Sequence, residues 1–100
     1  MEVEFRTDKL RKCYTESSVA FRAWGNKVGR RYIERVNVLK QAKSADEISK
    51  VAALRFHPLK GDRQGEYGIT LIDRWRMVVS FRDDAMTAVR IEEVSAHYGD

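Results

Sequence analysis

The spacing of the apolar residues changes once along this 100-residue chain, and that change most limits the fold. Over residues 17–43 the apolar side chains recur every three or four positions, which is the period of one helical face. From about residue 66 they alternate with polar side chains, as in strands with one buried face. Helices followed by a run of strands predict an α+β domain whose antiparallel meander packs on the helices.

The first half of the chain is expected to contain one strand and three helices. Residues 1–6 alternate between apolar and charged side chains, which indicates a half-buried strand. A short helix should follow a cap at Thr7 or Asp8 and end near residue 14. The second helix is long, over residues 17–43, and a short third should follow the capping box Ser44-Ala45-Asp46-Glu47 and end near residues 51–53.

The long helix has two unusual features. Gly25 and Gly29 each cost about 1 kcal/mol in a helix interior, and their spacing either lets another backbone approach closely or marks an irregularity. The face opposite the apolar stripe is basic, which fits either a solvated helix exterior or a surface that follows a phosphate backbone. Its residues are Arg22, Lys27, Arg30, Arg31, Arg35 and Lys40.

The second half is expected to form a loop and three strands. Pro58 favours extended backbone at His57, and the chain should leave the helices there as a loop. The alternating pattern then predicts strands over residues 67–71, 75–81 and 87–94. Trp24 and Trp75 lie on apolar stripes and are expected in the core.

The composition indicates a single domain over residues 1–100, with 43% hydrophobic residues to form its core. Nineteen Lys and Arg against fifteen Asp and Glu give a charge of +4, which weakly favours an anionic partner such as nucleic acid. One cysteine and two histidines indicate no disulfide framework and no zinc site, and no cofactor is expected. The sequence has neither a signal-peptide pattern nor a membrane span, so a cytoplasmic protein is expected.

Residues 55–76 concentrate the charged groups that catalysis uses. His57, Lys60 and Arg63 lie in the predicted loop, and Arg76 should stand on the sheet face opposite Trp75. If the last three strands are adjacent, the tail brings His97 and Tyr98 to the same region. Asp62 is expected to brace the loop by pairing with Lys60 or Arg63.

Such a set of side chains suits RNA cleavage without a metal ion. The RNA supplies its 2′-hydroxyl as nucleophile, and the protein needs a base, an acid and cations for the phosphate. Histidine serves as base or acid near neutral pH, and the arginine fork matches two phosphate oxygens. Each of these residues also has a purely structural interpretation, and the pattern alone indicates a basic α+β domain with a candidate two-histidine site.

Several motifs resemble the HigB-type (plasmid maintenance killer) toxins of the RelE-like superfamily. They are His57-Pro58-Leu59-Lys60-Gly61-Asp62-Arg63, Tyr67-Gly68-Ile69, Arg74-Trp75-Arg76, and Ile91-Glu92-Glu93-Val94 leading to His97. The resemblance implies a RelE-like fold, a bacterial toxin of a type II toxin–antitoxin system, and cleavage of mRNA in the ribosomal A site. It implies His57 and His97 as acid and base, and Lys60 and Arg76 as phosphate-stabilising residues. Contacts to RNA or the 70S ribosome would come from Arg55, Arg63, Arg74 and Tyr98.

The resemblance also implies a partner, a HigA-like antitoxin with a helix-turn-helix, through which alone the toxin would reach operator DNA. Two alternatives remain open. A binding module of the same fold could dock on the ribosome or antitoxin without cutting. That alternative is favoured by Ser95 and Ala96, which stand where relatives often have Asp and Tyr before the terminal histidine. A plain basic domain that binds free nucleic acid is the second alternative.

Overall fold

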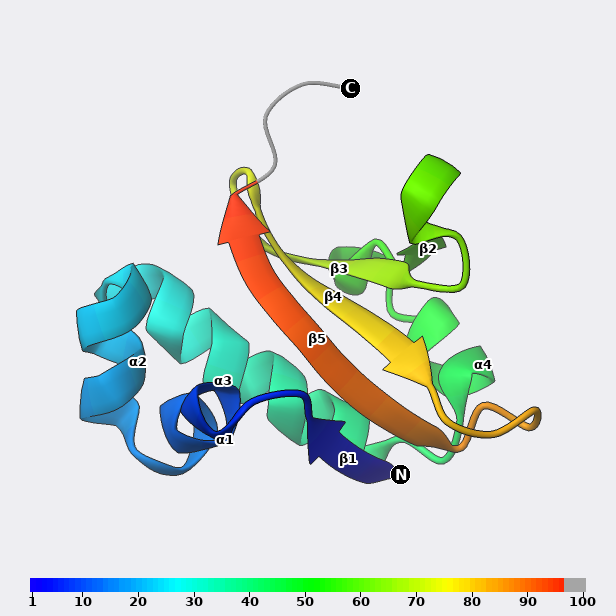
Figure 1. The fold of residues 1–100 in the computed structure, drawn as a ribbon, viewed down its shortest axis with the longest axis horizontal. Coiled ribbons are helices and arrows are strands. Elements are labelled where there is room, and N and C mark those ends of the chain that lie inside the picture. Colours follow the sequence, from blue (N-terminus) through cyan, green and yellow to red (C-terminus); the bar gives the residue numbers. More distant parts are fainter. Residues whose placement is uncertain (97–100) are drawn as a thin grey trace.

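The computed structural model describes residues 1–96, so the predictions made for His97 and Tyr98 lie outside the described residues. Four α-helices, two short 3-10 turns and five strands follow one another along the chain (Figure 1). They are β1 (Glu2–Phe5), α1 (Asp8–Thr15), α2 (Ser17–Trp24), α3 (Asn26–Gln41), α4 (Ala45–Ser49), η1 (Ala52–Leu54), β2 (His57–Pro58), η2 (Gly61–Arg63), β3 (Tyr67–Ile72), β4 (Trp75–Phe81) and β5 (Ala88–Ala96).

The strands form one mixed sheet in the order β1-β5-β4-β3-β2. The predicted antiparallel meander is confirmed as β3, β4 and β5, and the predicted N-terminal strand joins it as a parallel neighbour of β5. The segment expected to be a loop at His57 is instead a two-residue edge strand, β2, antiparallel to β3. Pro58 is compatible with this position, because an edge strand leaves one row of N–H groups unpaired.

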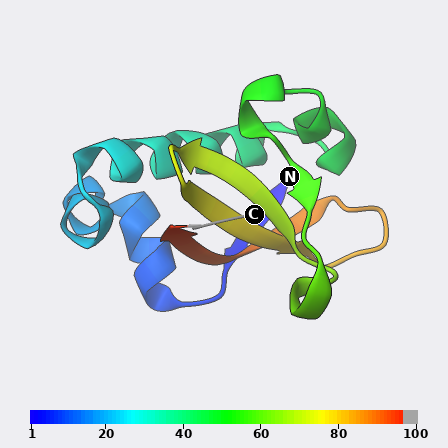
Figure 2. The same ribbon diagram turned by 90° about the horizontal axis from the view of Figure 1, so that it is seen from above.

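One face of the sheet forms the core, and the other is open. Helix α3 runs along the core face, as Figure 2 shows. The side chains that point toward this helix are fully buried, and most of the ones that alternate with them, Val78 excepted, are only half-buried. The buried set is Ile69, Leu71, Met77, Val79, Val89 and Ile91, and the half-buried set is Thr70, Arg76, Ser80 and Arg90.

The predicted long helix is wrong, because the chain breaks at Gly25 into α2 and α3. Gly25 has φ +88, a backbone conformation that glycine adopts far more readily than other residues. Gly29 matches the other expectation, that a glycine lets another backbone approach closely. A Cβ at Gly29 would lie 2.8 Å from Phe21 Cδ1 and 3.1 Å from the backbone carbon of Ala20, so its absence lets α2 pack closely on α3.

The predicted helix caps are confirmed only in part. The hydroxyl of Thr7 accepts a hydrogen bond from the Leu10 N–H at 3.2 Å and caps α1. Ser44 precedes α4, but its side chain makes no capping bond. Glu47 reaches back one residue further than expected and accepts from the Lys43 N–H at 2.8 Å. Ser44 is thus the N-cap residue as predicted, but neither of the two hydrogen bonds of the predicted capping box is formed.

The basic helix face is neither simply solvated nor wholly available to a phosphate backbone. Arg31 donates to the Leu71 carbonyl at 3.0 Å, and Arg35 donates to the Thr70 carbonyl at 3.1 Å. These carbonyls lie where β3 shifts its register, beyond its short pairing with β2. The two arginines thus satisfy polar groups at the edge of the sheet.

Both tryptophans pack partly buried against the core, as predicted. Trp24 meets Tyr32 edge-on at 4.8 Å, and the Tyr32 hydroxyl donates to the Leu10 carbonyl at 2.8 Å. Within residues 1–96, none of the helices has the length and apolar character needed to cross a bilayer.

Candidate functional site

A pocket of about 520 Å³ opens beside β2 on the face of the sheet that carries Arg76. It contains four of the predicted basic residues and His57 together. Its lining residues are Arg55, His57, Pro58, Leu59, Lys60, Arg63, Thr70 and Arg76. Arg74, in the β3–β4 turn, does not line this pocket.

Strand pairing brings these residues together. His57 lies opposite Gly68 across β2 and β3, and Thr70 lies opposite Arg76 across β3 and β4. The Leu59 N–H donates to the Glu66 carbonyl at 2.9 Å, which closes the segment that carries Lys60. Residues separated by up to 21 positions in sequence, from Arg55 to Arg76, therefore line one pocket.

The His57 ring is held by its backbone surroundings. Its Nδ1 lies 2.6 Å from the Arg55 carbonyl oxygen. A carbonyl only accepts, so Nδ1 carries the proton, and Nε2 of the neutral ring is left as a proton acceptor. The ring also rests against Gly68, where an added Cβ would lie 3.0 Å from Cε1 and 3.2 Å from Nε2. Arg55 itself has φ +48, a left-handed backbone that is uncommon outside glycine.

The cations of the pocket differ in their pairing. Arg63 is held by two carboxylates, with Nε 2.9 Å from Glu66 and Nη2 2.7 Å from Glu93. Asp62, which was expected to pair with the loop cations, is not the partner of Arg63 in these two bonds. Arg76 is half-buried, and its Nε is buried without a hydrogen-bond partner among residues 1–96. An unpaired buried donor is costly to leave unsatisfied, so Arg76 is suited to receive an anion.

Together these groups meet two requirements for cleavage of an RNA phosphodiester, a proton acceptor and cations that bind the phosphate. Nε2 of His57 can accept a proton, and Lys60 and Arg76 can offset negative charge on a phosphate. In the described part of the chain, His, Cys, Asp and Glu side chains do not gather in any group of three that could hold a metal ion.

The sequence matches no protein-family model and no curated protein. Solved structures do match. The YoeB/ParE toxin from Agrobacterium tumefaciens has a TM-score of 0.64 and 13% identity, with 98% of this chain and 100% of that chain covered. The YoeB–YefM complex from Staphylococcus aureus has a TM-score of 0.55 and 20% identity, with 98% of each chain covered. The toxin–antitoxin complex RelBE2 from Mycobacterium tuberculosis has a TM-score of 0.50 and 18% identity, with 96% of each covered.

The protein has a RelE-like toxin fold. The fold predicted from the sequence is thereby confirmed across almost the whole chain. At 13–20% identity the likeness concerns the fold alone, and the more specific HigB-type resemblance stays a prediction.

Sequence reasoning missed one residue beside this pocket of the RelE-like fold, Glu93. On β5 it pairs in register with Val78, two positions along β4 from Arg76, and the Ser95 hydroxyl donates to its second oxygen at 2.8 Å. Burial raises the pKa of Glu93, but hydrogen bonds from Arg63 and Ser95 and the charges of Arg63 and Arg76 together outweigh this, and the pKa lies below its usual value. The hydrogen bond to Glu93 in turn raises the pKa of Arg63.

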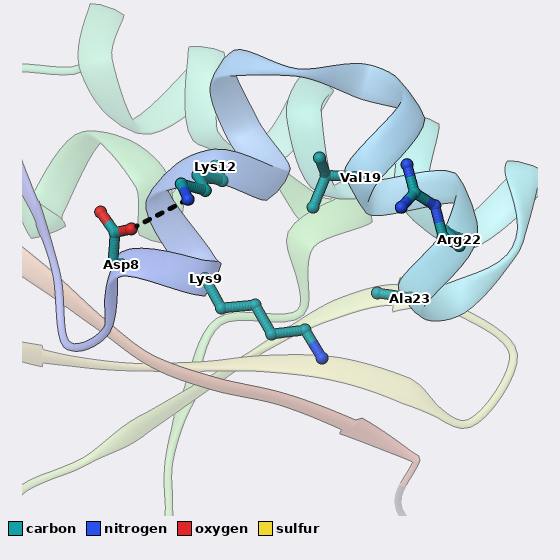
Figure 3. A pocket seen from close by; sticks show the side chains of 6 residues that line it. All are labelled: Asp8, Lys9, Lys12, Val19, Arg22 and Ala23. Atoms are coloured by element: carbon teal, nitrogen blue, oxygen red, sulfur yellow. Dashed lines mark ion pairs between the residues drawn. The ribbon is translucent and has the colours of Figure 1, made fainter.

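A second hollow, of about 540 Å³, lies between α1 and α2 (Figure 3). It is lined by Asp8, Lys9, Lys12, Val19, Arg22 and Ala23. Asp8 is bound by Arg11 and by Lys12, which hold the pKa of its carboxyl below the usual value. The hollow is basic, but its lining includes no histidine, and it shares no residue with the pocket at His57.

Proposed function

We propose that this protein is the toxin of a bacterial type II toxin–antitoxin system and cleaves mRNA in the A site of the ribosome. The observation that carries the proposal is the pocket that combines His57 with Lys60 and Arg76. The RelE-like toxin fold supports it, because the similar structures are named as toxins. The action would take place in the cytoplasm, where the ribosomes are.

The proposed reaction needs no metal ion and no cofactor. Nε2 of His57 takes the proton of the RNA 2′-hydroxyl, whose oxygen then bonds to the adjacent phosphorus. The bond from phosphorus to the 5′-oxygen breaks, which leaves a 2′,3′-cyclic phosphate on one fragment. Lys60 and Arg76 stabilise the charge on the phosphate oxygens. His97 would give a proton to the departing 5′-oxygen, a role that rests on the family resemblance and on a residue outside the described part of the chain.

The proposed partner is a HigA-like antitoxin with a helix-turn-helix, which would neutralise the toxin and carry it to operator DNA. The name of the Mycobacterium tuberculosis structure, a toxin–antitoxin complex, supports an antitoxin partner. The ribosome and mRNA would be the remaining partners.

Mapping of mRNA 5′ ends in a purified translation system tests the activity. Wild-type protein should produce new ends inside codons only when ribosomes are present. His57→Ala, Arg76→Ala and His97→Ala should each lose these ends while keeping the circular dichroism spectrum of the wild type. Arg82→Ala is the matched control, because Arg82 is an exposed arginine that does not line the pocket.

Three results would contradict the proposal. Ends produced equally on free mRNA would show a nuclease that does not depend on ribosomes. Ribosome binding without new ends would favour the non-catalytic binding module. Binding to free nucleic acid with a steep salt dependence and no preference for ribosomes would favour a plain basic domain.

A further inference from the structure

Arg63 joins two parts of the structure that are far apart in sequence. It lies in η2, and its Nη2 contacts Glu93 on β5, 30 residues later. Glu93 is opposite Val78 on β4, and Val78 is opposite Gly68 on β3. The Arg63–Glu93 contact therefore crosses β4 on the open face and links the segment around η2 to β5.

The link is supported at both ends. The second Arg63 contact, to Glu66 at 2.9 Å, lies within the same short segment. Glu93 is oriented by the Ser95 hydroxyl at 2.8 Å. Both side chains of the Arg63–Glu93 pair are about one-third exposed, at 35% and 32%, so solvent screens the pair only in part. Val78 beneath this span is fully buried although it points away from the helices.

The segment held by this link is the one that carries Lys60. Among the described residues 1–96, the backbone hydrogen bonds of residues 59–66 stay within the segment, from Leu59 to Glu66, Arg63 to Lys60, Gln64 to Gly61 and Glu66 to Arg63. These bonds shape the segment but do not fix it over the sheet. Among the ion pairs of residues 1–96, Arg63–Glu93 is the one that connects the segment to another strand.

We propose that Glu93 is a positioning residue: through Arg63 it fastens residues 59–66 across the sheet and holds Lys60 at the pocket of His57 and Arg76. The effect on catalysis rests on the proposed function, whereas the effect on the segment does not. Arg63 accordingly has a structural role, because its charge is paired with the carboxylates of Glu66 and Glu93. Lys60 and Arg76 form no ion pair within residues 1–96, although the charge of Arg76 contributes to the lowered pKa of Glu93, and both remain as cations for a phosphate.

Hydrogen exchange of backbone amides tests the link directly. Glu93→Gln keeps the shape of the side chain and removes its charge, and Glu66→Gln is the matched control, which weakens Arg63 only within its own segment. In Glu93→Gln the amides of Arg63, Gln64 and Glu66 should exchange about tenfold faster, while the β4–β5 amides keep wild-type rates. Glu66→Gln should change the exchange rates of these amides by less than about twofold.

Single-turnover cleavage at saturating ribosomes provides the second measurement. Glu93→Gln should slow cleavage about tenfold with ribosome affinity unchanged, because misplacement of a stabilising group affects the transition state rather than binding. Adding Glu93→Gln to Arg63→Ala should cause no further loss, since a residue that acts only through Arg63 has no effect once Arg63 is gone.

Unchanged exchange in Glu93→Gln, or equal acceleration in Glu66→Gln, would overturn the proposal. So would a loosened segment with a wild-type cleavage rate, because Lys60 would then not depend on the link. A further loss in the double variant would show that Glu93 acts on the site directly. If the wild-type protein cleaves no mRNA, the proposed function fails while hydrogen exchange still decides whether the link exists.

Discussion

At the scale of single residues, the position of His57 depends on the absence of a side chain. Its ring occupies the space where a Cβ of Gly68 would be, and Gly68 is buried in β3. The Arg55 carbonyl fixes Nδ1 at the same time. The ring is thus held by one hydrogen bond and one close contact, and both depend on the backbone.

Gly68→Ala is expected to displace the His57 ring with little effect on folding. No left-handed φ stands in the way of alanine here, and the tight contacts are with the side chains of His57 and Leu59. Misplacing a catalytic group by about 1 Å can cost on the order of 10²-fold in rate. Cleavage assays and thermal unfolding of the variant check this. Wild-type cleavage by a folded Gly68→Ala protein would show that the ring position is not needed.

The sequence predicted much of this site at the residue scale. The basic loop and the alternation after Glu66 predicted that His57, Lys60 and Arg63 lie near Arg76, and these four residues line one pocket. Their catalytic roles stay a prediction. Glu93 was not predicted, because β5 shifts its register between Ile91 and Glu93. A bulge of this kind changes which side chains face the pocket and has no clear signal in the hydrophobic pattern.

At the scale of elements, α2 and α3 were predicted as one helix because their apolar stripes continue through Gly25. Periodicity reports which face is buried but not whether the axis turns. The turn at Gly25 needs a backbone conformation, and the close packing at Gly29 needs a missing Cβ. Neither requirement changes the spacing of the apolar residues.

Gly29→Ala should destabilise the protein, although a glycine in a helix interior normally costs about 1 kcal/mol relative to alanine. The new Cβ would lie 2.8 Å from Phe21 Cδ1 and 3.1 Å from the Ala20 backbone. Overpacking of this kind costs about 1–3 kcal/mol. Urea unfolding measures the difference. Phe21→Leu in the Gly29→Ala background should recover part of the loss, and a stabilised Gly29→Ala would contradict the close packing of α2 on α3.

Arg35→Met should destabilise the protein by about 1–3 kcal/mol, because a partly buried carbonyl would lose a charged donor. The contact concerned is the bond from Arg35 Nε to the Thr70 carbonyl at 3.1 Å. Desolvation lowers the pKa of Arg35, as expected for a cation that is partly removed from water. Lys27→Met is the control on the same helix, because Lys27 is exposed. Equal stability of the two variants would show that Arg35 is only a surface cation.

At the scale of the whole molecule, the pair of Arg63 and Glu93 ties the stability of the fold to pH. The folded-state pKa of Glu93 lies below its usual value. A carboxylate of this kind contributes stability above its unfolded pKa, and the contribution is lost as the pH falls through the folded pKa. Protonation of Glu93 therefore weakens the attachment of residues 59–66 in acid.

The free energy of unfolding, measured between pH 7 and pH 3, should fall more steeply for the wild type than for Glu93→Gln. The two curves should approach each other as the pH falls through the range, below the usual pKa of a glutamate, in which the carboxyl of Glu93 becomes protonated. The variant has no carboxyl at this position and loses nothing from it. Parallel curves over the whole range would show that the Arg63–Glu93 pair adds no stability.

The pairing of β1 with β5 has a consequence for how the protein is made. Residues 2–5 pair with residues 88–91, so β1 can join the sheet only after β5 has emerged from the ribosome. Contacts between such distant segments form late in folding. A nascent chain that stops before β5 also lacks Glu93 and cannot fasten the segment of Lys60. On the proposed function, the site is therefore not assembled until β5 has been synthesised.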